Sequence, residues 1–176
     1  MKEIRDGTIK TAIFDMDGTI YQLDGDNNGF KNSSLHKLMT ENTLKFFVKK
    51  ENISLAEAQL IFDKLNKDHA FPSVYASEKY GITRKEFFNE VWNINPQSIV
   101  TNYEEAIKVI YELANRNIEL ILLSQAPKVW QNNVFTFLNL HNIFAEIYTG
   151  EDYMHKTEMF PQFAKTRNPL TILAVG

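Results

Sequence analysis

The stretch Thr11-Ala12-Ile13-Phe14-Asp15-Met16-Asp17-Gly18-Thr19 joins a short apolar run directly to two aspartates, a glycine and a threonine. An unbroken apolar run followed at once by turn residues is typical of a buried strand that ends in a turn. The two aspartates are two positions apart, which places their carboxylates on the same side of an extended chain. We therefore predict a strand over residues 11–14, with Asp15 and Asp17 at its carboxyl end.

Three further runs have the same apolar character, over residues 118–123, 170–175 and, more weakly, 145–148. Strands that are apolar on both faces belong to parallel sheets covered by helices. We therefore expect these three runs to join the first strand in one parallel sheet.

Helical patterns separate the later strands. Thr101-x-x-Glu104 predicts a capping box at the start of one helix, whose apolar stripe continues to Ala114. A second apolar stripe at helical spacing predicts the next helix and consists of Trp130, Val134, Phe137 and Leu138. The alternation of strands and helices predicts an α/β fold built on a doubly wound parallel sheet.

Residues 24–100 contain no strand-like run, whereas helix starts recur in them. Ser54-x-x-Glu57 and Thr83-x-x-Glu86 each match a capping box that precedes an apolar stripe. We therefore predict a helical cap subdomain over residues 24–100. It would be inserted into an α/β core formed by residues 1–23 and 101–176.

Composition and charge narrow the function classes. The chain has 176 residues, of which 44% are hydrophobic. A chain of this size can form one hydrophobic core with a small helical subdomain. Its 19 basic and 22 acidic side chains give a net charge of −3, which argues against the broad basic surface that nucleic-acid binding requires. The absence of cysteine excludes disulfides, thiolate chemistry and cysteine-ligated zinc. Residues 1–6 show no signal peptide and no apolar run reaches about 20 residues, so we expect a cytoplasmic protein without a membrane partner, whose oligomeric state the sequence does not indicate.

Polar residues follow the predicted strands, where ligands of parallel α/β sheets bind. Two neighbouring carboxylates repel each other, and a divalent cation relieves that repulsion; oxygen ligands alone favour Mg²⁺. A lysine and a serine hydroxyl suit the oxygens of a phosphoryl group. We therefore predict a phosphate site with Mg²⁺ at this edge of the sheet. The residues that follow the strands are Asp15, Asp17, Gly18, Thr19, Ser124, Gln125, Glu151, Asp152 and Lys156.

Four segments resemble the successive motifs of haloacid dehalogenase-like (HAD) phosphohydrolases: Phe14-Asp15-Met16-Asp17-Gly18-Thr19, Leu122-Leu123-Ser124, Lys156 and Ala174-Val175-Gly176. The resemblance spans the whole chain, because members of this superfamily commonly insert a helical cap between the first and second motifs. It implies a Rossmann-like core beneath that cap. Tyr21 and the length of the cap are also similar to the pyrimidine 5′-nucleotidase-like branch.

The resemblance implies a role for each site residue. Asp15 would be the nucleophile that forms an aspartyl-phosphate, and Asp17 the acid for the leaving group and then the base for water. Mg²⁺ would be held by the carboxylate of Asp15 and the backbone carbonyl of Asp17. The substrate would be a small phosphorylated metabolite, such as a nucleoside monophosphate or a sugar phosphate. The implied phosphate-binding residues are Gly18, Thr19, Ser124, Gln125 and Lys156.

Three positions depart from the family pattern. Gln125 stands where an asparagine often follows the second motif, and Thr157 stands where a proline often follows the lysine. The fourth motif continues from its glycine to an aspartate that binds the metal, whereas this sequence ends at Gly176. We therefore expect a C-terminally truncated chain that is weakly active or inactive, in which Asp152 or the terminal carboxylate of Gly176 substitutes poorly for the missing ligand.

Each of these residues also has a structural explanation. Asp-x-Asp-Gly-Thr also fits a capped turn, Ser124 a helix cap, and Lys156 a solvated side chain with Lys165 as its rival. Glu151 and Asp152 also fit exposed loop acids. The alternative function is therefore a non-catalytic protein of this fold that binds a ligand or a partner. The aromatic residues of the cap would line a substrate pocket or form the core of the cap; they are Phe71, Tyr75, Tyr80, Phe88 and Trp92.

Overall fold

The computed structural model describes residues 8–25, 29–153 and 155–176. The amino-terminal segment on which the signal-peptide expectation rests therefore lies outside the described residues. The chain divides into two compact units, Met1–Asp24 with Pro96–Gly176 and, separately, Gly25–Asn95.

The division falls at residues 25 and 95, whereas the sequence placed it at 24 and 100. Two short antiparallel strands, β2 (Gln22–Leu23) and β3 (Val100–Thr101), explain the difference. In addition, the backbone N–H of Asp24 donates to the carbonyl of Ile99 over 2.7 Å. This pairing ties residues 96–101 to the first unit.

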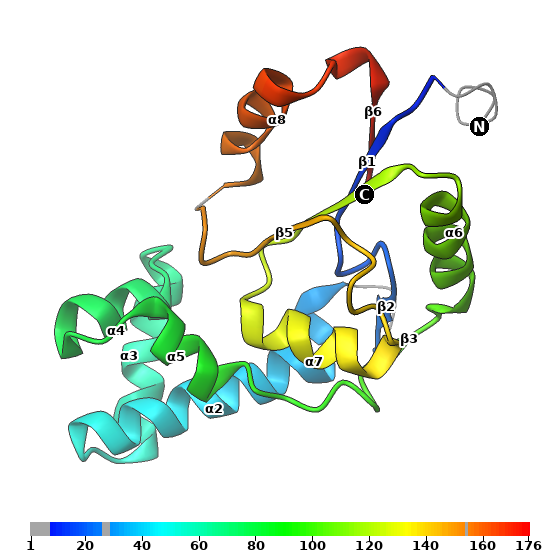
Figure 1. Cartoon of the computed structure of the whole chain (residues 1–176). Helices are drawn as coiled ribbons and strands as arrows, with labels where there is room; N and C mark the ends of the chain where they lie inside the picture. The colour runs from blue at the N-terminus through cyan, green and yellow to red at the C-terminus, as the bar shows by residue number, and fades with distance from the viewer. Residues whose placement is uncertain (1–7, 26–28, 154) are drawn as a thin grey trace. The chain divides into compact units, whose positions relative to one another are not determined.

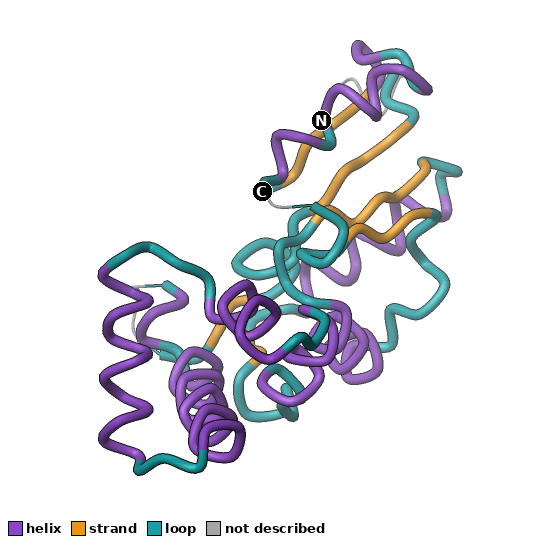
Figure 2. The backbone as a smooth tube through the Cα atoms, turned by 90° about the vertical axis from the view of Figure 1, so that its left-hand side faces the viewer, coloured by secondary structure: helices purple, strands orange, loops and turns teal. Residues whose placement is uncertain are grey.

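The first unit contains a parallel four-stranded sheet in the order β5-β4-β1-β6 (Figures 1 and 2). This sheet confirms the predicted α/β class. Strand β1 has the predicted bounds, β4 and β5 each begin one residue later than predicted, and β6 begins two residues later because a 3₁₀ turn, Pro169–Thr171, precedes it. The bounds are β1 Thr11–Phe14, β4 Glu119–Leu123, β5 Glu146–Tyr148 and β6 Ile172–Val175.

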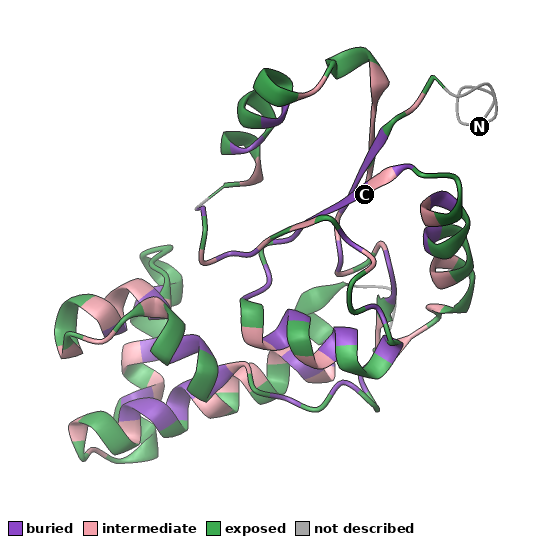
Figure 3. Ribbon diagram, viewed as in Figure 1, coloured by how far each residue is buried: buried purple, intermediate pink, exposed green. Residues whose placement is uncertain are grey.

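Helices cover both faces of this sheet. On one face, Ile13 and Ile121 pack in a cluster with Phe163 of α8 (Phe160–Thr166). On the other face, Phe14 contacts Phe144 edge to face. Phe144 in turn stacks on Phe135 of α7 (Lys128–Leu138). Successive side chains of a strand point to opposite faces, so the near-continuous apolar strands are explained by two apolar layers. Strands β1 and β4 are the most deeply buried (Figure 3).

One helix start is not where the sequence placed it. Helix α6 (Glu104–Asn115) begins after Tyr103 and has no side-chain cap. Thr101 lies in β3, and its hydroxyl donates to the carbonyl of Gln22 over 3.2 Å. The capping-box prediction was therefore wrong, because the hydroxyl of Thr101 bonds a residue of the neighbouring strand instead of the helix.

In α7, the predicted apolar stripe is buried except at Phe137, which is 36% exposed.

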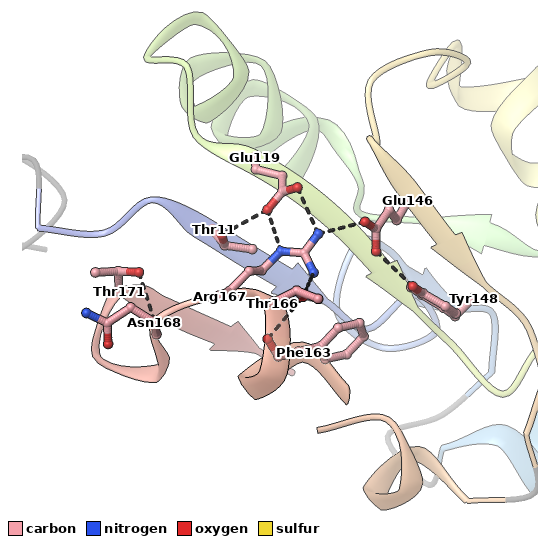
Figure 4. Close-up of polar contacts among 9 residues, drawn as sticks. All are labelled: Thr11, Glu119, Glu146, Tyr148, Phe163, Thr166, Arg167, Asn168 and Thr171. Carbon is pink, nitrogen blue, oxygen red and sulfur yellow. Dashed lines mark hydrogen bonds and ion pairs between the residues drawn. The ribbon is translucent and has the colours of Figure 1, made fainter. Parts of the chain in front are cut away.

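Arg167, directly after α8, joins the amino ends of the strands (Figure 4). Its Nε and Nη2 lie 2.7 and 2.8 Å from the two carboxylate oxygens of Glu119, and Nη2 lies 2.7 Å from Oε1 of Glu146. Thr11 donates to Glu119 over 3.0 Å, and the Tyr148 hydroxyl donates to Glu146 over 2.8 Å. This network fastens α8 to β1, β4 and β5 at the edge opposite to Asp15.

The second unit, Gly25–Asn95, is helical. Both capping boxes predicted in it are present: the hydroxyl of Ser54 accepts from Glu57 N–H over 3.3 Å, and that of Thr83 accepts from Glu86 N–H over 3.2 Å. Its α-helices are α2 Ser34–Glu51, α3 Leu55–Lys67, α4 Pro72–Tyr80 and α5 Arg84–Val91.

Most of the aromatic residues noted in the cap have partners inside this unit. The Tyr75 ring packs edge to face on Phe47, and its hydroxyl lies 3.3 Å from Glu51. Lys79 reaches the same carboxylate over 2.7 Å. Trp92 stacks on Phe30 with 6.1 Å between ring centroids. These are contacts of the kind expected for a cap core.

None of the helices within the described ranges has both the length and the apolar character needed to cross a membrane.

Candidate active site

Asp15 is the first residue after β1. Its backbone N–H donates to the carbonyl of Val175 in the neighbouring strand β6 over 2.9 Å. One carboxylate oxygen, Oδ1, accepts from the Met16 N–H over 2.7 Å, and the other, Oδ2, lies 2.5 Å from Nζ of Lys156. The side chain is 31% exposed. Asp15 is thus held in position at the carboxyl edge of the sheet while it stays accessible to a ligand.

A tight turn follows Asp15 and brings Asp17 next to Tyr21. Gly18 adopts a φ of +81°, a left-handed conformation that favours glycine. Its N–H donates to the carbonyl of Tyr21 over 2.9 Å, and the N–H groups of Thr19 and Ile20 both donate to the carbonyl of Met16. The sequence Asp-Gly-Thr is therefore a turn, as its composition predicts, and the turn serves to position two side chains.

The carboxylate of Asp17 is held by two buried aromatic residues. Its Oδ1 accepts from the Tyr21 hydroxyl and from Nε1 of Trp130, the latter over 3.2 Å. The Trp130 Nε1 also lies 3.0 Å from the Tyr21 oxygen. Tyr21 and Trp130 are both fully buried. Because Trp130 belongs to α7, this contact ties the first-strand turn to a helix more than a hundred residues later.

Burial raises the pKa of the Asp17 carboxyl above its usual value, and the negative charge of Asp15 acts in the same direction. The hydrogen bonds from Tyr21 and Trp130 and the charge of Lys156 act in the opposite direction. Burial is the largest of these effects. A carboxyl group whose pKa is raised in this way is suited to give and take a proton.

Ser124 follows β4 and is 1% exposed. Its N–H donates to the carbonyl of Tyr148 over 3.2 Å, and its Oγ accepts from the Ala126 N–H over 3.2 Å. The acceptor role leaves the hydroxyl proton to be donated elsewhere. The buried Gln131 of α7 bonds the carbonyls of Ala126 and Tyr148 over 3.0 and 3.3 Å, which fixes the loops after β4 and β5 together.

Gln125 is exposed, and its backbone closely approaches the loop after β5. A Cβ atom at Gly150 would lie 2.1 Å from the Gln125 carbonyl oxygen. Only glycine permits this approach. The two loops that border the site are therefore packed backbone to backbone.

Lys156, rather than its rival Lys165, contacts Asp15. The two loop acids before it have structural partners. Glu151 accepts from the Lys128 N–H at the start of α7 over 3.0 Å, and Oδ2 of Asp152 accepts from the N–H and hydroxyl of Thr149 over 2.8 and 3.0 Å. Asp152 therefore acts as a turn residue, and its assignment as a metal ligand stays a prediction.

The donor atoms at this edge fit Mg²⁺ in kind. Asp15 and Asp17 supply oxygen atoms only, and Mg²⁺ is commonly held by one or two carboxylates with water and substrate phosphate. Within the described ranges, no group of three or more His, Asp or Glu side chains forms a metal site. A Cβ atom at Gly176 would lie 3.5 Å from Cβ of Asp15 and 4.0 Å from Oγ1 of Thr19. The end of β6 therefore adjoins Asp15.

Tyr21 and Trp130 are the site residues that sequence reasoning did not assign. Tyr21 was noted only for a family likeness, and Trp130 only for its place in an apolar stripe. The available signal is chemical: a buried phenol or indole needs a hydrogen-bond partner. The sequence does not say which residue that partner is.

Comparison with known proteins gives a family match and likenesses among solved structures. The model of the family described as "Haloacid dehalogenase-like hydrolase" matches residues 12–169. Comparison with curated protein sequences gave no match. A solved structure described as a "Putative Phosphatase from Clostridium difficile" is similar with a TM-score of 0.48 at 12% identity, over 94% of this chain and 75% of that one. At that level of similarity, the activity of that protein says nothing about this chain.

Proposed function

Because the chain belongs to the haloacid dehalogenase-like hydrolase family, we propose that it is a Mg²⁺-dependent phosphatase that acts on a small phosphorylated metabolite through an aspartyl-phosphate. One observation carries the proposal. Two carboxylates with different environments, Asp15 and Asp17, lie at the carboxyl end of β1, and Lys156 contacts the first of them. Two carboxyl groups whose environments differ in this way can take different chemical roles.

Asp15 is the nucleophile of this proposal. Its side chain is accessible, its Oδ1 is oriented by the Met16 N–H, and its Oδ2 faces Lys156. The ammonium group offsets part of the repulsion between the carboxylate and an approaching phosphate dianion. Attack of an Asp15 oxygen on phosphorus forms the acyl-phosphate bond as the bond from phosphorus to the leaving oxygen breaks.

Asp17 moves the proton. In the first step its carboxyl group donates a proton to the leaving oxygen, which departs as an alcohol. In the second step the resulting carboxylate takes a proton from the water that attacks phosphorus, so that phosphate is released and Asp15 and the Asp17 proton are restored. The raised pKa of Asp17 supports the first role.

The remaining residues bind and orient the phosphoryl group. We assign this role to the Ser124 hydroxyl, Lys156 and the polar groups of Gly18, Thr19 and Gln125. Asp15 and the backbone carbonyl of Asp17 would hold Mg²⁺, which supplies charge neutralisation for the transferring phosphoryl group when bound. Nucleoside monophosphates and sugar phosphates are the substrates that we propose to test first.

The test is hydrolysis of p-nitrophenyl phosphate and of a panel of metabolite phosphates by the purified chain, with Mg²⁺ and with a chelator. We expect turnover that requires Mg²⁺, and a covalent phosphate that is stable in acid. Borohydride reduction of this acyl phosphate should convert residue 15 to homoserine. Turnover without any phosphoenzyme would contradict the mechanism. Binding of Mg²⁺ and phosphate without turnover would favour a non-catalytic ligand-binding protein.

A further inference from the structure

Asp17, Tyr21 and Trp130 form a closed triangle of hydrogen bonds. The Tyr21 hydroxyl donates to Oδ1 of Asp17, and the Trp130 indole N–H is shared between that same Oδ1, at 3.2 Å, and the Tyr21 oxygen, at 3.0 Å. Both aromatic side chains are 0% exposed. Bulk water therefore cannot replace either donor.

The direction of each bond follows from the chemistry of the groups. An indole N–H only donates, so Trp130 donates to both oxygens. The Tyr21 hydroxyl has a single proton, and its oxygen already accepts from Trp130, so this proton goes to Asp17. Oδ1 of Asp17 consequently accepts two hydrogen bonds, one from Tyr21 and one from Trp130.

This arrangement distinguishes the two carboxyl oxygens. A proton on Oδ1 would point toward two other donors. One of those hydrogen bonds would then be lost beside two fully buried side chains, which costs free energy. Oδ2 accepts no hydrogen bond from any residue within the described ranges. Oδ2 is therefore the oxygen of Asp17 that remains free to exchange a proton with a ligand.

We propose that Tyr21 and Trp130 are positioning residues that assign proton transfer to Oδ2 of Asp17. They anchor Oδ1, so the carboxyl group keeps one orientation while Oδ2 alone gives a proton to the leaving oxygen and later takes one from water. This inference rests on the proposed phosphatase function and adds two residues to it. Neither Tyr21 nor Trp130 touches the reacting atoms in this scheme.

The alternative is that the two aromatic residues only fill the core. The two explanations differ in what Tyr21→Phe should do, because phenylalanine keeps the ring and removes the donor. A packing role predicts the same change in rate for every substrate. A positioning role predicts a loss that grows as the leaving group becomes poorer, since only poor leaving groups need the proton from Asp17.

The experiment measures kcat/KM of wild type and Tyr21→Phe with p-nitrophenyl phosphate, phenyl phosphate and an alkyl phosphate. We expect a loss of less than about 3-fold for p-nitrophenyl phosphate and of about 10- to 100-fold for the alkyl ester. Tyr111→Phe is the matched control. Tyr111 is a partly exposed residue of α6, and its hydroxyl donates to the carbonyl of Asn139, directly after α7, over 2.9 Å. This variant should leave all three rates unchanged. Thermal unfolding of each variant checks that it is folded.

A second readout does not depend on activity. The chain has two tryptophans, Trp92 and Trp130, and Trp92→Phe assigns their indole N–H signals in the proton NMR spectrum. We expect Tyr21→Phe and Asp17→Ala each to shift the Trp130 signal, whereas Tyr111→Phe should not.

The outcomes separate the two proposals. If wild type turns over and Tyr21→Phe slows every ester equally, or none, the positioning role is wrong and the phosphatase function stands. An unshifted Trp130 signal would likewise overturn the triangle. A folded wild type without turnover in the presence of Mg²⁺ would overturn the phosphatase function and with it the role in proton transfer, whereas the Trp130 signal would still test the hydrogen-bonded triangle.

Discussion

The two edges of the four-stranded sheet contain the same charges in different arrangements. At the carboxyl edge lie two carboxylates, Asp15 and Asp17, with Lys156. At the amino edge lie two carboxylates, Glu119 and Glu146, with Arg167 (Figure 4). The counts of acidic and basic groups therefore do not distinguish a reactive site from a structural one.

Hydrogen bonding distinguishes them. At the amino edge every carboxylate oxygen has a donor, and the Arg167 guanidinium lowers the pKa of Glu119. At the carboxyl edge, Oδ1 of Asp17 has two donors, while Oδ2 has none within the described residues. Burial raises the pKa of the Asp17 carboxyl group. Saturated carboxylates hold elements together, whereas an incompletely bonded and enclosed carboxyl group is available for chemistry.

The largest expected effect is that of Asp15→Asn. Asparagine cannot form an acyl phosphate, so we expect phosphatase turnover to fall by more than about 10³-fold. The comparison at the other edge is Glu119→Gln, which should leave kcat/KM within about 2-fold, because surface and scaffold changes act on stability instead. Steady-state rates with p-nitrophenyl phosphate measure both. Equal losses in the two variants would remove the distinction between the edges.

Asp17→Asn should have the next largest effect. General acid catalysis typically contributes about 10²- to 10⁴-fold, and we expect a loss of that size for alkyl phosphates. Esters with good leaving groups need less protonation, so for them the rate of phosphoenzyme formation should fall less. A single-turnover measurement across the ester series tests this. Identical losses for all esters would show that Asp17 does not protonate the leaving group.

Lys156→Gln should reduce kcat/KM by about 10- to 100-fold, the effect expected when a charged hydrogen-bonding group is lost. Its matched control is Lys165→Gln, a nearby lysine on α8. The second variant should retain wild-type kinetics and wild-type inhibition by inorganic phosphate. A larger defect in Lys165→Gln would mean that the contact between Lys156 and Asp15 is only structural.

A carboxylate added after β6 should strengthen the binding of Mg²⁺ at the carboxyl edge. Gly176 adjoins Asp15, so an aspartate placed directly after it brings a third acid to this edge. We expect Mg²⁺ to bind about 10-fold more tightly to that chain than to one with asparagine in the same place, because affinity rises with the charge of the ligands. Calorimetric titration with Mg²⁺ compares the two. Equal affinities would show that the end of β6 does not contribute to metal binding.

Changes at the amino edge should have the smallest effect on activity and act on stability. Arg167→Met leaves Glu119 and Glu146 without their shared cation, and we expect a loss of about 1 kcal/mol in the free energy of unfolding of the first unit, because both carboxylates are more than one third exposed. Chemical denaturation measures this loss. Unchanged stability would show that the network does not fasten α8.

The same edge has a predicted pH dependence. The pKa of Glu119 is lower in the folded protein than its usual value of 4.5, so its contribution to stability is fully present above pH 4.5. It disappears as the pH falls through the lowered folded-state pKa. The stability difference between wild type and Glu119→Gln should therefore shrink in acid. A difference that is constant with pH would contradict this assignment.

Local sequence patterns were sufficient for elements whose partners are close in the chain. The apolar run before Asp15 marked β1 with its observed bounds, and Ser54 and Thr83 formed their capping boxes as predicted. In each case the pattern and the contact lie within a few residues of each other. Thr101 matched the same capping pattern and failed, because its partner Gln22 is distant in sequence.

The environment of the site residues depended on tertiary structure. The sequence placed Asp15, Asp17 and Lys156 near the carboxyl edge, because the order of strands and turns is a local property. It did not reveal that Trp130 donates to Asp17, nor that Arg167 binds Glu119. A hydrogen bond or a pKa shift depends on which groups meet across the assembled sheet, and hydrophobic periodicity contains no information about pairings between residues that are tens of positions apart.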